Sequence, residues 1–104
     1  MKTGIELIAE ERQRQIEVEG WTPEHDADHT AQELARAASC YAMPAVGRVL
    51  DGTFVGIPND FPFGKSWWKP TPENRVKELV KAGALIAAEI DRLQEIKRKQ
   101  GFIN

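Results

Sequence analysis

The sequence has one cysteine and no long apolar run, and these two scarcities exclude whole classes of protein. Cys40 has no second cysteine with which to form a disulfide inside the chain. No run of about 18 apolar residues is present, so we expect no membrane-spanning helix. With no signal peptide either, we expect a cytoplasmic protein. A glycine-rich phosphate loop, a CxxC pair and a serine–histidine–aspartate order with a recognisable elbow are also missing, which removes those enzyme classes.

The charges are divided unevenly along the 104 residues. The formal net charge is only −2, but residues 1–33 hold nine acids and three bases, whereas residues 34–104 hold seven acids and eleven bases. A dipolar chain of this kind does not present the extended basic surface that coats nucleic acid. A chain of this length has enough residues for one hydrophobic core, so we expect a single domain over residues 1–104.

Helical periodicity predicts an all-α, three-helix bundle-like domain. Thr3 and Glu6 have the spacing of a capping box, in which each side chain bonds the other residue's backbone. Apolar residues then recur at helical spacing, so this pattern predicts a first helix over about residues 4–19. Gly20 follows as a stop, because glycine readily adopts the left-handed conformation that ends helices.

Two further helices are expected after the histidine-containing segment. Thr30 and Glu33 form a second capping-box pattern, which predicts a helix over about residues 30–43. The Thr-Pro-Glu sequence at 71–73 combines an N-cap, a first-position proline and an acid, and predicts a third helix over about 72–98. Its expected core stripe consists of Val76, Leu79, Val80, Gly83, Ile86, Ala87, Ile90 and Leu93.

The third helix also carries apolar residues away from that stripe. Leu85 and Ile96 indicate that a second face of this helix is buried. Because a small helical chain often completes its burial by association, we predict a homo-oligomer formed through this helix.

Residues 44–70 lie between the second and third predicted helices and keep no helical period. They contain four of the six prolines and four of the eight glycines. We expect a long Pro/Gly/aromatic loop with a short β-hairpin at 48–55, because Asp51-Gly52 suits a type I′ turn. The loop ends in an aromatic and basic cluster at 61–69. Long loops in compact domains are often functional.

The aromatic and basic residues near this loop predict a nucleotide-binding site. Aromatic faces stack on nucleobases, and lysine or arginine near a helix N-terminus binds phosphate. The structural alternative is an aromatic lid that closes the bundle, with the lysines in solvent. The cluster also includes Lys65 and Lys77. The candidate ligand-binding residues are Trp67, Trp68, Lys69, Arg75 and Lys81, with Arg12, Arg14 and Tyr41 as further polar contacts.

A metal site or an acid cluster would point to other chemistry. His25, His29 and Glu33 follow one another at intervals of four, and on a continuous helix they would reach one metal ion. Histidines in turns are commoner than metal ligands, and the capping box already uses Glu33. The alternative enzyme site places magnesium among carboxylates, with water as nucleophile. Its candidate catalytic residues are Glu10, Glu17, Glu33 and Glu89.

The chain contains four distinctive segments: ERQRQIEVEGWTPEHD at residues 11–26, ELARAASCYA, the Trp-Trp-Lys-Pro segment and the closing LVKAGALIAAEIDRL. Together they resemble a family of small phage and prophage proteins, and the resemblance covers nearly the whole chain. The helical outline is similar to the MazG-like all-α nucleoside triphosphate pyrophosphatases. Those enzymes bind magnesium through paired Glu-x-x-Glu and Glu-x-x-Asp motifs. This chain contains neither spacing, so no catalytic position carries over.

We therefore expect a phage-type helical protein that binds a nucleotide or a nucleotide-derived signalling molecule. By holding the molecule in the host cytoplasm, it would withdraw it from a host defence system. Two alternatives remain open at this point. One is a MazG-like, magnesium-dependent nucleoside triphosphate pyrophosphatase, and the other is a structural or protein-binding helical oligomer.

Overall fold

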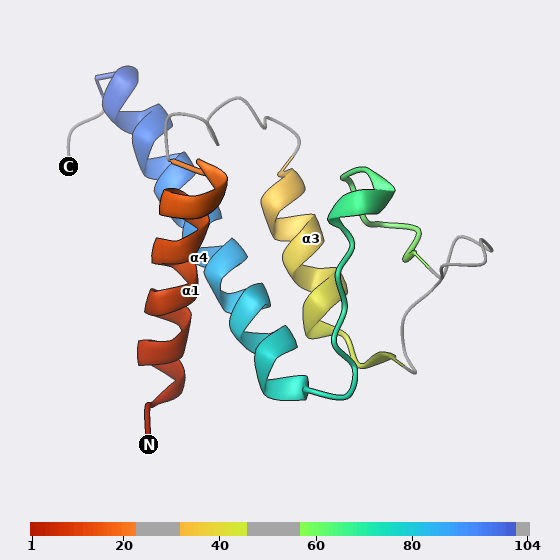
Figure 1. Cartoon of the computed structure of the whole chain (residues 1–104). Coiled ribbons are helices and arrows are strands. Elements are labelled where there is room, and N and C mark those ends of the chain that lie inside the picture. Colours follow the sequence, from red (N-terminus) through yellow and green to blue (C-terminus); the bar gives the residue numbers. More distant parts are fainter. Residues whose placement is uncertain (23–31, 46–56, 102–104) are drawn as a thin grey trace.

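The computed structural model describes residues 1–22, 32–45 and 57–101, and this part of the chain is mainly helical (Figure 1). The all-α prediction is confirmed there, and none of its helices is long and apolar enough to cross a membrane. The expected hairpin at 48–55 lies outside the described residues. The helices are α1 (Gly4–Glu19), α3 (Glu33–Ala42) and α4 (Arg75–Lys99), and the 3-10 turn η2 (Lys65–Trp67) lies between α3 and α4.

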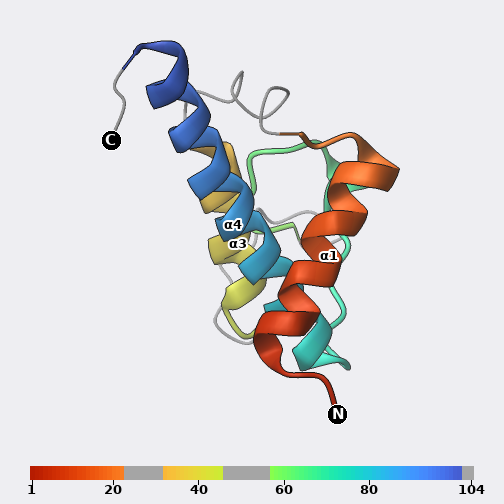
Figure 2. The ribbon, with the colours of Figure 1, turned by 90° about the vertical axis from the view of Figure 1, so that its left-hand side faces the viewer.

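α4 is the central element, because α1 and α3 both pack against it. In Figure 1 these two helices stand apart on either side of α4, and Figure 2 shows α1 lying across it. The segment from Ile57 to Pro70 runs alongside α3 in Figure 1. α1, α3 and this segment are thus arranged around α4.

Both predicted ends of α1 are confirmed. The Thr3 hydroxyl accepts a hydrogen bond from the Glu6 backbone N–H at 3.2 Å, and the Glu6 carboxylate accepts one from the Thr3 N–H at 2.8 Å. At the other end Gly20 has φ +73°, a left-handed conformation that costs glycine little. The chain then reverses, and the Trp21 N–H donates to the Gln15 carbonyl at 3.1 Å.

The predicted start of the second helix is wrong. Gln32 has φ +59° and ψ +37°, which no residue inside a right-handed helix adopts, so α3 begins at Glu33. Thr30 lies outside the described residues. The helix ends at Ala42, because Met43 is extended at ψ +129°. Met43 precedes Pro44, and a residue before proline is driven away from the α conformation.

The third helix starts later than its Thr-Pro-Glu signal predicts. Thr71 to Asn74 form a turn closed by a 2.8 Å bond from the Asn74 N–H to the Thr71 carbonyl. Pro72 occupies the second turn position, where its fixed φ fits as well as it does in a helix. Asn74 is the N-cap, since its side chain accepts from the Lys77 N–H at 3.2 Å. A proline at this position therefore does not by itself distinguish a turn from the start of a helix.

The predicted core stripe of α4 is largely exposed. Leu93 is 44% exposed and Val76 is 61% exposed, and the stripe residues Leu79, Ile86 and Ile90 lie between these values. The buried face instead holds small residues and Leu85, so the second-face prediction for Leu85 is confirmed. Small residues let α3 approach closely, which explains why this face packs inward. It consists of Ala82, Ala84, Leu85 and Ala88 together with Glu78, Glu89 and Arg92.

The contact between α1 and α4 depends on one glycine. A Cβ added at Gly83 would lie 2.5 Å from Ile8 Cδ1 and 2.9 Å from Ile8 Cγ1. Near the same crossing, the Arg12 guanidinium is buried between the helices and donates to Asp91 at 3.4 Å. The core itself lies between α3, α4 and the loop, where Leu34, Tyr41, Phe61 and Leu85 pack together.

Candidate functional site

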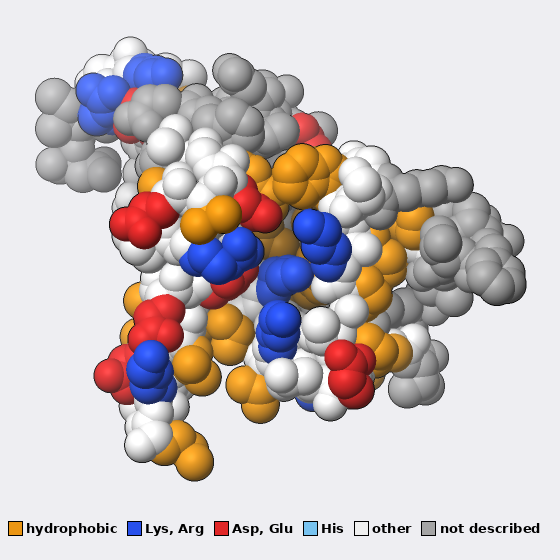
Figure 3. Space-filling view, viewed as in Figure 1, with side chains coloured by type: hydrophobic (Ala, Val, Ile, Leu, Met, Phe, Trp, Pro, Cys, Tyr) orange, Lys and Arg blue, Asp and Glu red, His pale blue; other side chains and the backbone are white. Residues whose placement is uncertain are grey.

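A cavity of about 440 Å³ lies between α1, α3, α4 and the 57–70 loop. This volume falls in the range of small-molecule sites. Figure 3 shows lysine and arginine side chains gathered around a hollow on this face, with hydrophobic side chains at its depth. α4 supplies the floor through Lys77, Val80, Lys81 and Leu85. The cavity exists only because α1 and α3 pack on α4 without contacting each other in the described structure.

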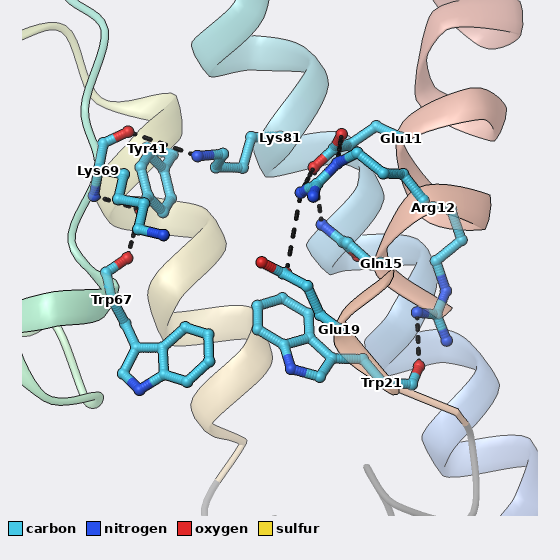
Figure 4. A network of polar contacts seen from close by, with 10 residues as sticks. Glu11, Arg12, Gln15, Glu19, Trp21, Tyr41, Trp67, Lys69 and Lys81 are labelled. Carbon is cyan, nitrogen blue, oxygen red and sulfur yellow. Dashed lines mark hydrogen bonds and ion pairs between the residues drawn. The ribbon is translucent and has the colours of Figure 1, made fainter. Parts of the chain in front are cut away.

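One wall of the cavity is aromatic. Trp21, at the end of α1, and Trp67, in η2, approach with ring centroids 5.7 Å apart and planes inclined by 48°. Trp67 is 46% exposed, so part of its ring is open to a ligand. Figure 4 shows both indole rings side by side below Lys81. Phe61 and Phe63, which stack edge to face at 5.9 Å, complete the apolar lining here.

Tyr41 of α3 fixes the loop that carries Trp67 and Lys69. Its hydroxyl donates to the Trp67 carbonyl at 3.1 Å and accepts from the Lys69 N–H at 3.0 Å (Figure 4). The tyrosine is 3% exposed, so both bonds are shielded from water. A single side chain from the helical core therefore holds the wall residue Trp67 and the basic residue Lys69 in register.

Three cavity lysines have no carboxylate oxygen within 4.0 Å among the described residues: Lys69, Lys77 and Lys81. The Lys81 ammonium lies 5.0 Å from the centre of the Tyr41 ring, a cation–π distance. Burial lowers the pKa of Lys81 below its ordinary 10.5, and Lys77 adds to this, while Glu11 opposes it. An anionic ligand would relieve the unfavourable desolvation of this charge.

The two carboxylates in the cavity are both held by Arg14. Its guanidinium donates to the two Glu11 oxygens at 2.8 Å each, and it lies 3.8 Å from Glu19. The hydrogen bond from Arg14 lowers the pKa of Glu11. Because four basic and two acidic side chains line the cavity, it carries an excess of positive charge. Gln15, 1% exposed, has a carbonyl oxygen with no hydrogen-bond partner among the described residues.

The structure brings five of the eight predicted ligand residues together at this cavity. They come from α1, α3, α4 and the loop, which are far apart in the sequence. Lys77, named as part of the same basic cluster, also lines it. The five are Arg14, Tyr41, Trp67, Lys69 and Lys81.

The other three predicted ligand residues lie outside the cavity lining and have structural contacts. Trp68 packs on Tyr41 and Phe61, with ring centroids 4.7 Å and 5.1 Å away. Arg75 donates to the Tyr41 carbonyl at 2.9 Å and to the Ala42 carbonyl, and so binds the end of α3. Arg12 donates to the Trp21 carbonyl at 2.9 Å, on the α1–α4 side.

The four carboxylates proposed for a magnesium enzyme do not meet in the structure. Glu10 is exposed and pairs with Lys2 at 2.6 Å, and Glu17 is exposed and accepts from Gln13 at 2.7 Å. Glu33 opens α3, and Glu89 is buried in a 2.6 Å pair with Arg92. No group of three potential metal ligands occurs among the described residues. His25 and His29 lie outside them.

Sequence reasoning found only Arg14 on the α1 wall of the cavity. Glu11, Gln15 and Glu19 recur at intervals of four, which places them on one helix face. Glu10 and Glu17, seven residues apart, lie on a neighbouring face of the same helix. Periodicity alone does not reveal which of the two faces lines a cavity. Phe61 and Phe63 were recognised as an aromatic cluster but not assigned to the site.

Comparison with known proteins adds no relative from which an activity could be transferred. No protein-family model, curated protein or solved structure matches this chain. The resemblance to small phage proteins and to MazG-like pyrophosphatases therefore stays a prediction, and the geometry of the cavity is the basis for assigning a function.

Proposed function

We propose that this cavity binds a nucleotide or a nucleotide-derived signalling molecule. The observation that supports the proposal most directly is the pairing of an aromatic wall with three lysines that have no carboxylate partner in the described structure. A nucleobase stacks on the open part of the Trp67 ring. Its phosphates then reach Lys69, Lys77 and Lys81, where the excess positive charge lies.

The same geometry favours binding over hydrolysis. A magnesium-dependent pyrophosphatase needs carboxylates that are free to coordinate the ion. In this cavity Glu11 is engaged by two hydrogen bonds from Arg14, and Glu19 lies 3.8 Å from the same guanidinium. We therefore propose sequestration of the intact molecule. In a phage-encoded protein this would withdraw a host defence signal.

The first experiment is a thermal-shift and calorimetric titration of the purified protein. The probes are ATP, GTP, their mono- and diphosphates, cyclic AMP and a cyclic dinucleotide, each with and without magnesium. A probe at 100 times its dissociation constant stabilises the native state by about 2.7 kcal/mol, which is easily detected in a domain of this size. We expect at least one phosphate-bearing probe to bind and to be recovered intact.

Variants then locate the site. The Trp67→Ala, Lys69→Ala double variant should weaken binding of that probe at least about tenfold, because it removes a stacking face and a charge-assisted contact. Lys97→Ala is the matched control, since Lys97 is exposed near the opposite end of α4. Equal affinity in the double variant and the control would exclude the cavity. Magnesium-dependent cleavage of the probe would instead favour the pyrophosphatase, and no binding across the panel would favour a protein partner.

A further inference from the structure

The apolar stripe on the outer face of α4 has the spacing of a helix-pairing surface. Val76, Leu79, Ile86, Ile90 and Leu93 follow alternating steps of three and four residues once Gly83 is included. This is the heptad spacing by which two helices bury a common seam. All five side chains are between 44% and 61% exposed in the single chain. The stripe covers about 27 Å of helix at 1.5 Å per residue.

Its place on α4 separates this stripe from the cavity. Residues advance by about 100° per position around a helix. On that basis Lys77, Lys81 and Leu85 point to one side, and the apolar stripe points to the other. The exposed stripe is therefore not explained by the cavity, and its apolar area is on the order of 400 Å², which for a small monomer is typical of an interaction surface.

We infer that two copies of this chain associate through this stripe, with their α4 helices antiparallel. Placing Val76 opposite the partner's Leu93 also places Leu79 opposite the partner's Ile90, and Ile86 opposite the partner's Gly83, which the partner's own Ile8 covers. Every large apolar residue of the stripe then has an apolar or small neighbour. A second copy is the occupant favoured here because the stripe matches itself end to end.

The charges that flank the stripe also support the antiparallel arrangement. Glu73 precedes the stripe and Lys97 follows it, and both are exposed. In the antiparallel pair each Glu73 lies near the partner's Lys97, and twofold symmetry provides this ion pair twice. A parallel pair would instead place Lys97 beside Lys97, within the basic end of α4. Like charges at such positions oppose pairing.

Sedimentation equilibrium tests the association, and it does not depend on the proposed function because the stripe lies away from the cavity. We expect the wild-type protein to be a dimer at about 0.1 mM, and Ile90→Glu to raise the dimer dissociation constant at least about tenfold. Val18→Glu is the matched control, since Val18 is a 71% exposed apolar residue on α1. A monomeric wild type would overturn the inference, as would equal dimer constants for Ile90→Glu and Val18→Glu.

Single-cysteine substitutions test the orientation. In the antiparallel pair, Ile86 and the partner's Ile86 lie on either side of the twofold axis, only about 4.5 Å apart along the helix axis, so Ile86→Cys should form an intermolecular disulfide on mild oxidation. Val76 lies about 25 Å from the partner's Val76 along the axis, beyond the reach of a disulfide, so Val76→Cys should not. Cys40 is buried and common to both variants. Crosslinking of both variants at equal rates would indicate a parallel pair and contradict the arrangement.

Discussion

At the scale of single residues, the position of Lys81 destabilises the folded state but suits an anionic ligand. Its ammonium is half-buried above the Tyr41 ring, and no carboxylate lies within ion-pair distance of it in the described part of the chain. Folding therefore removes water from a charge that Glu11 and Glu19 compensate only in part. Such an arrangement is typical of functional sites, where a residue's own environment is unfavourable until the ligand arrives.

Replacing Lys81 with methionine should make the protein more stable and the site weaker. Because the folded-state pKa lies below 10.5, the charged form is penalised on folding. The penalty is complete below the folded pKa and disappears as the pH rises toward 10.5. Lys81→Met should therefore melt at a higher temperature than the wild-type protein at pH 7, by an amount that solvent screening of the half-buried ammonium keeps small. Melting temperatures at pH 7 and about pH 10.5 would measure the gain.

The same charge penalty on Lys81 defines the control variant and the result that would contradict the prediction. Lys99→Met, at an exposed lysine near the end of α4, should change the melting temperature little at either pH. If Lys81→Met raised the melting temperature just as much at the higher pH, where the wild-type lysine is largely neutral, the cause would be packing of the methionine and not removal of the charge. Affinity for the nucleotide probe should fall in the same variant, because the phosphates lose one cation.

Which individual residues could be predicted depended on how distinctive their surroundings are in the sequence. Trp67 and Lys69 lie in the aromatic and basic segment at 61–69, and Lys81 lies in the basic first turns of the helix that follows, so all three are recognisable without a structure. Arg12 was harder, because it occupies an apolar position of the α1 repeat and is buried there. A buried arginine that binds a backbone carbonyl looks the same in a sequence as one that binds a phosphate.

At the scale of elements, the α1–α4 crossing depends on how closely the two backbones approach. Gly83→Val should destabilise the protein by about 2 kcal/mol, because the added methyl groups would meet Ile8, 2.5 Å from the position of the first carbon. The measurement is chemical unfolding. Ile8→Ala should cost stability alone, but less in the Gly83→Val background, since the smaller side chain makes room. Strict additivity in the double variant would contradict this contact.

Helix existence was easier to predict than helix faces and ends. Periodicity placed α1, α3 and α4 correctly along the chain because apolar spacing is a local property. The face of α4 that packs on α3 is set by the alanines and Leu85, whose small volumes matter only once α3 is present. The Thr-Pro-Glu signal before α4 fits a turn as well as a helix start. The buried face of α4 therefore depends on a helix that is distant from it in the sequence, and local periodicity does not report such a contact.

At the scale of the whole molecule, the site depends on a division of charge between parts of the chain. The acidic α1 supplies Glu11 and Glu19 to the cavity, and the basic remainder of the chain supplies Lys69, Lys77 and Lys81. Their excess positive charge should make nucleotide affinity depend on salt. We expect ATP affinity to fall several-fold between about 0.05 M and about 0.5 M sodium chloride, as the Debye length shortens.

Adenosine is the matched control for this prediction. It retains the base that stacks on the aromatic wall but carries no phosphate, so its affinity should change less than about twofold over the same salt range. Calorimetry would measure both. Equal salt dependence for ATP and adenosine would show that the lysines do not bind the phosphates, even if the cavity binds the base.

The Tyr41 hydroxyl has a consequence for the time a ligand stays bound. It bonds the backbone of both Trp67 and Lys69, so the aromatic wall of the cavity and the basic residue beside it are attached to the core through one oxygen atom. Loss of this hydroxyl would therefore release both backbone positions at once. If the cavity holds a signalling molecule as we propose, opening this side would break both bonds, and the exit of the molecule should be slow. Residence time, more than equilibrium occupancy, is then the quantity that we expect this oxygen atom to control.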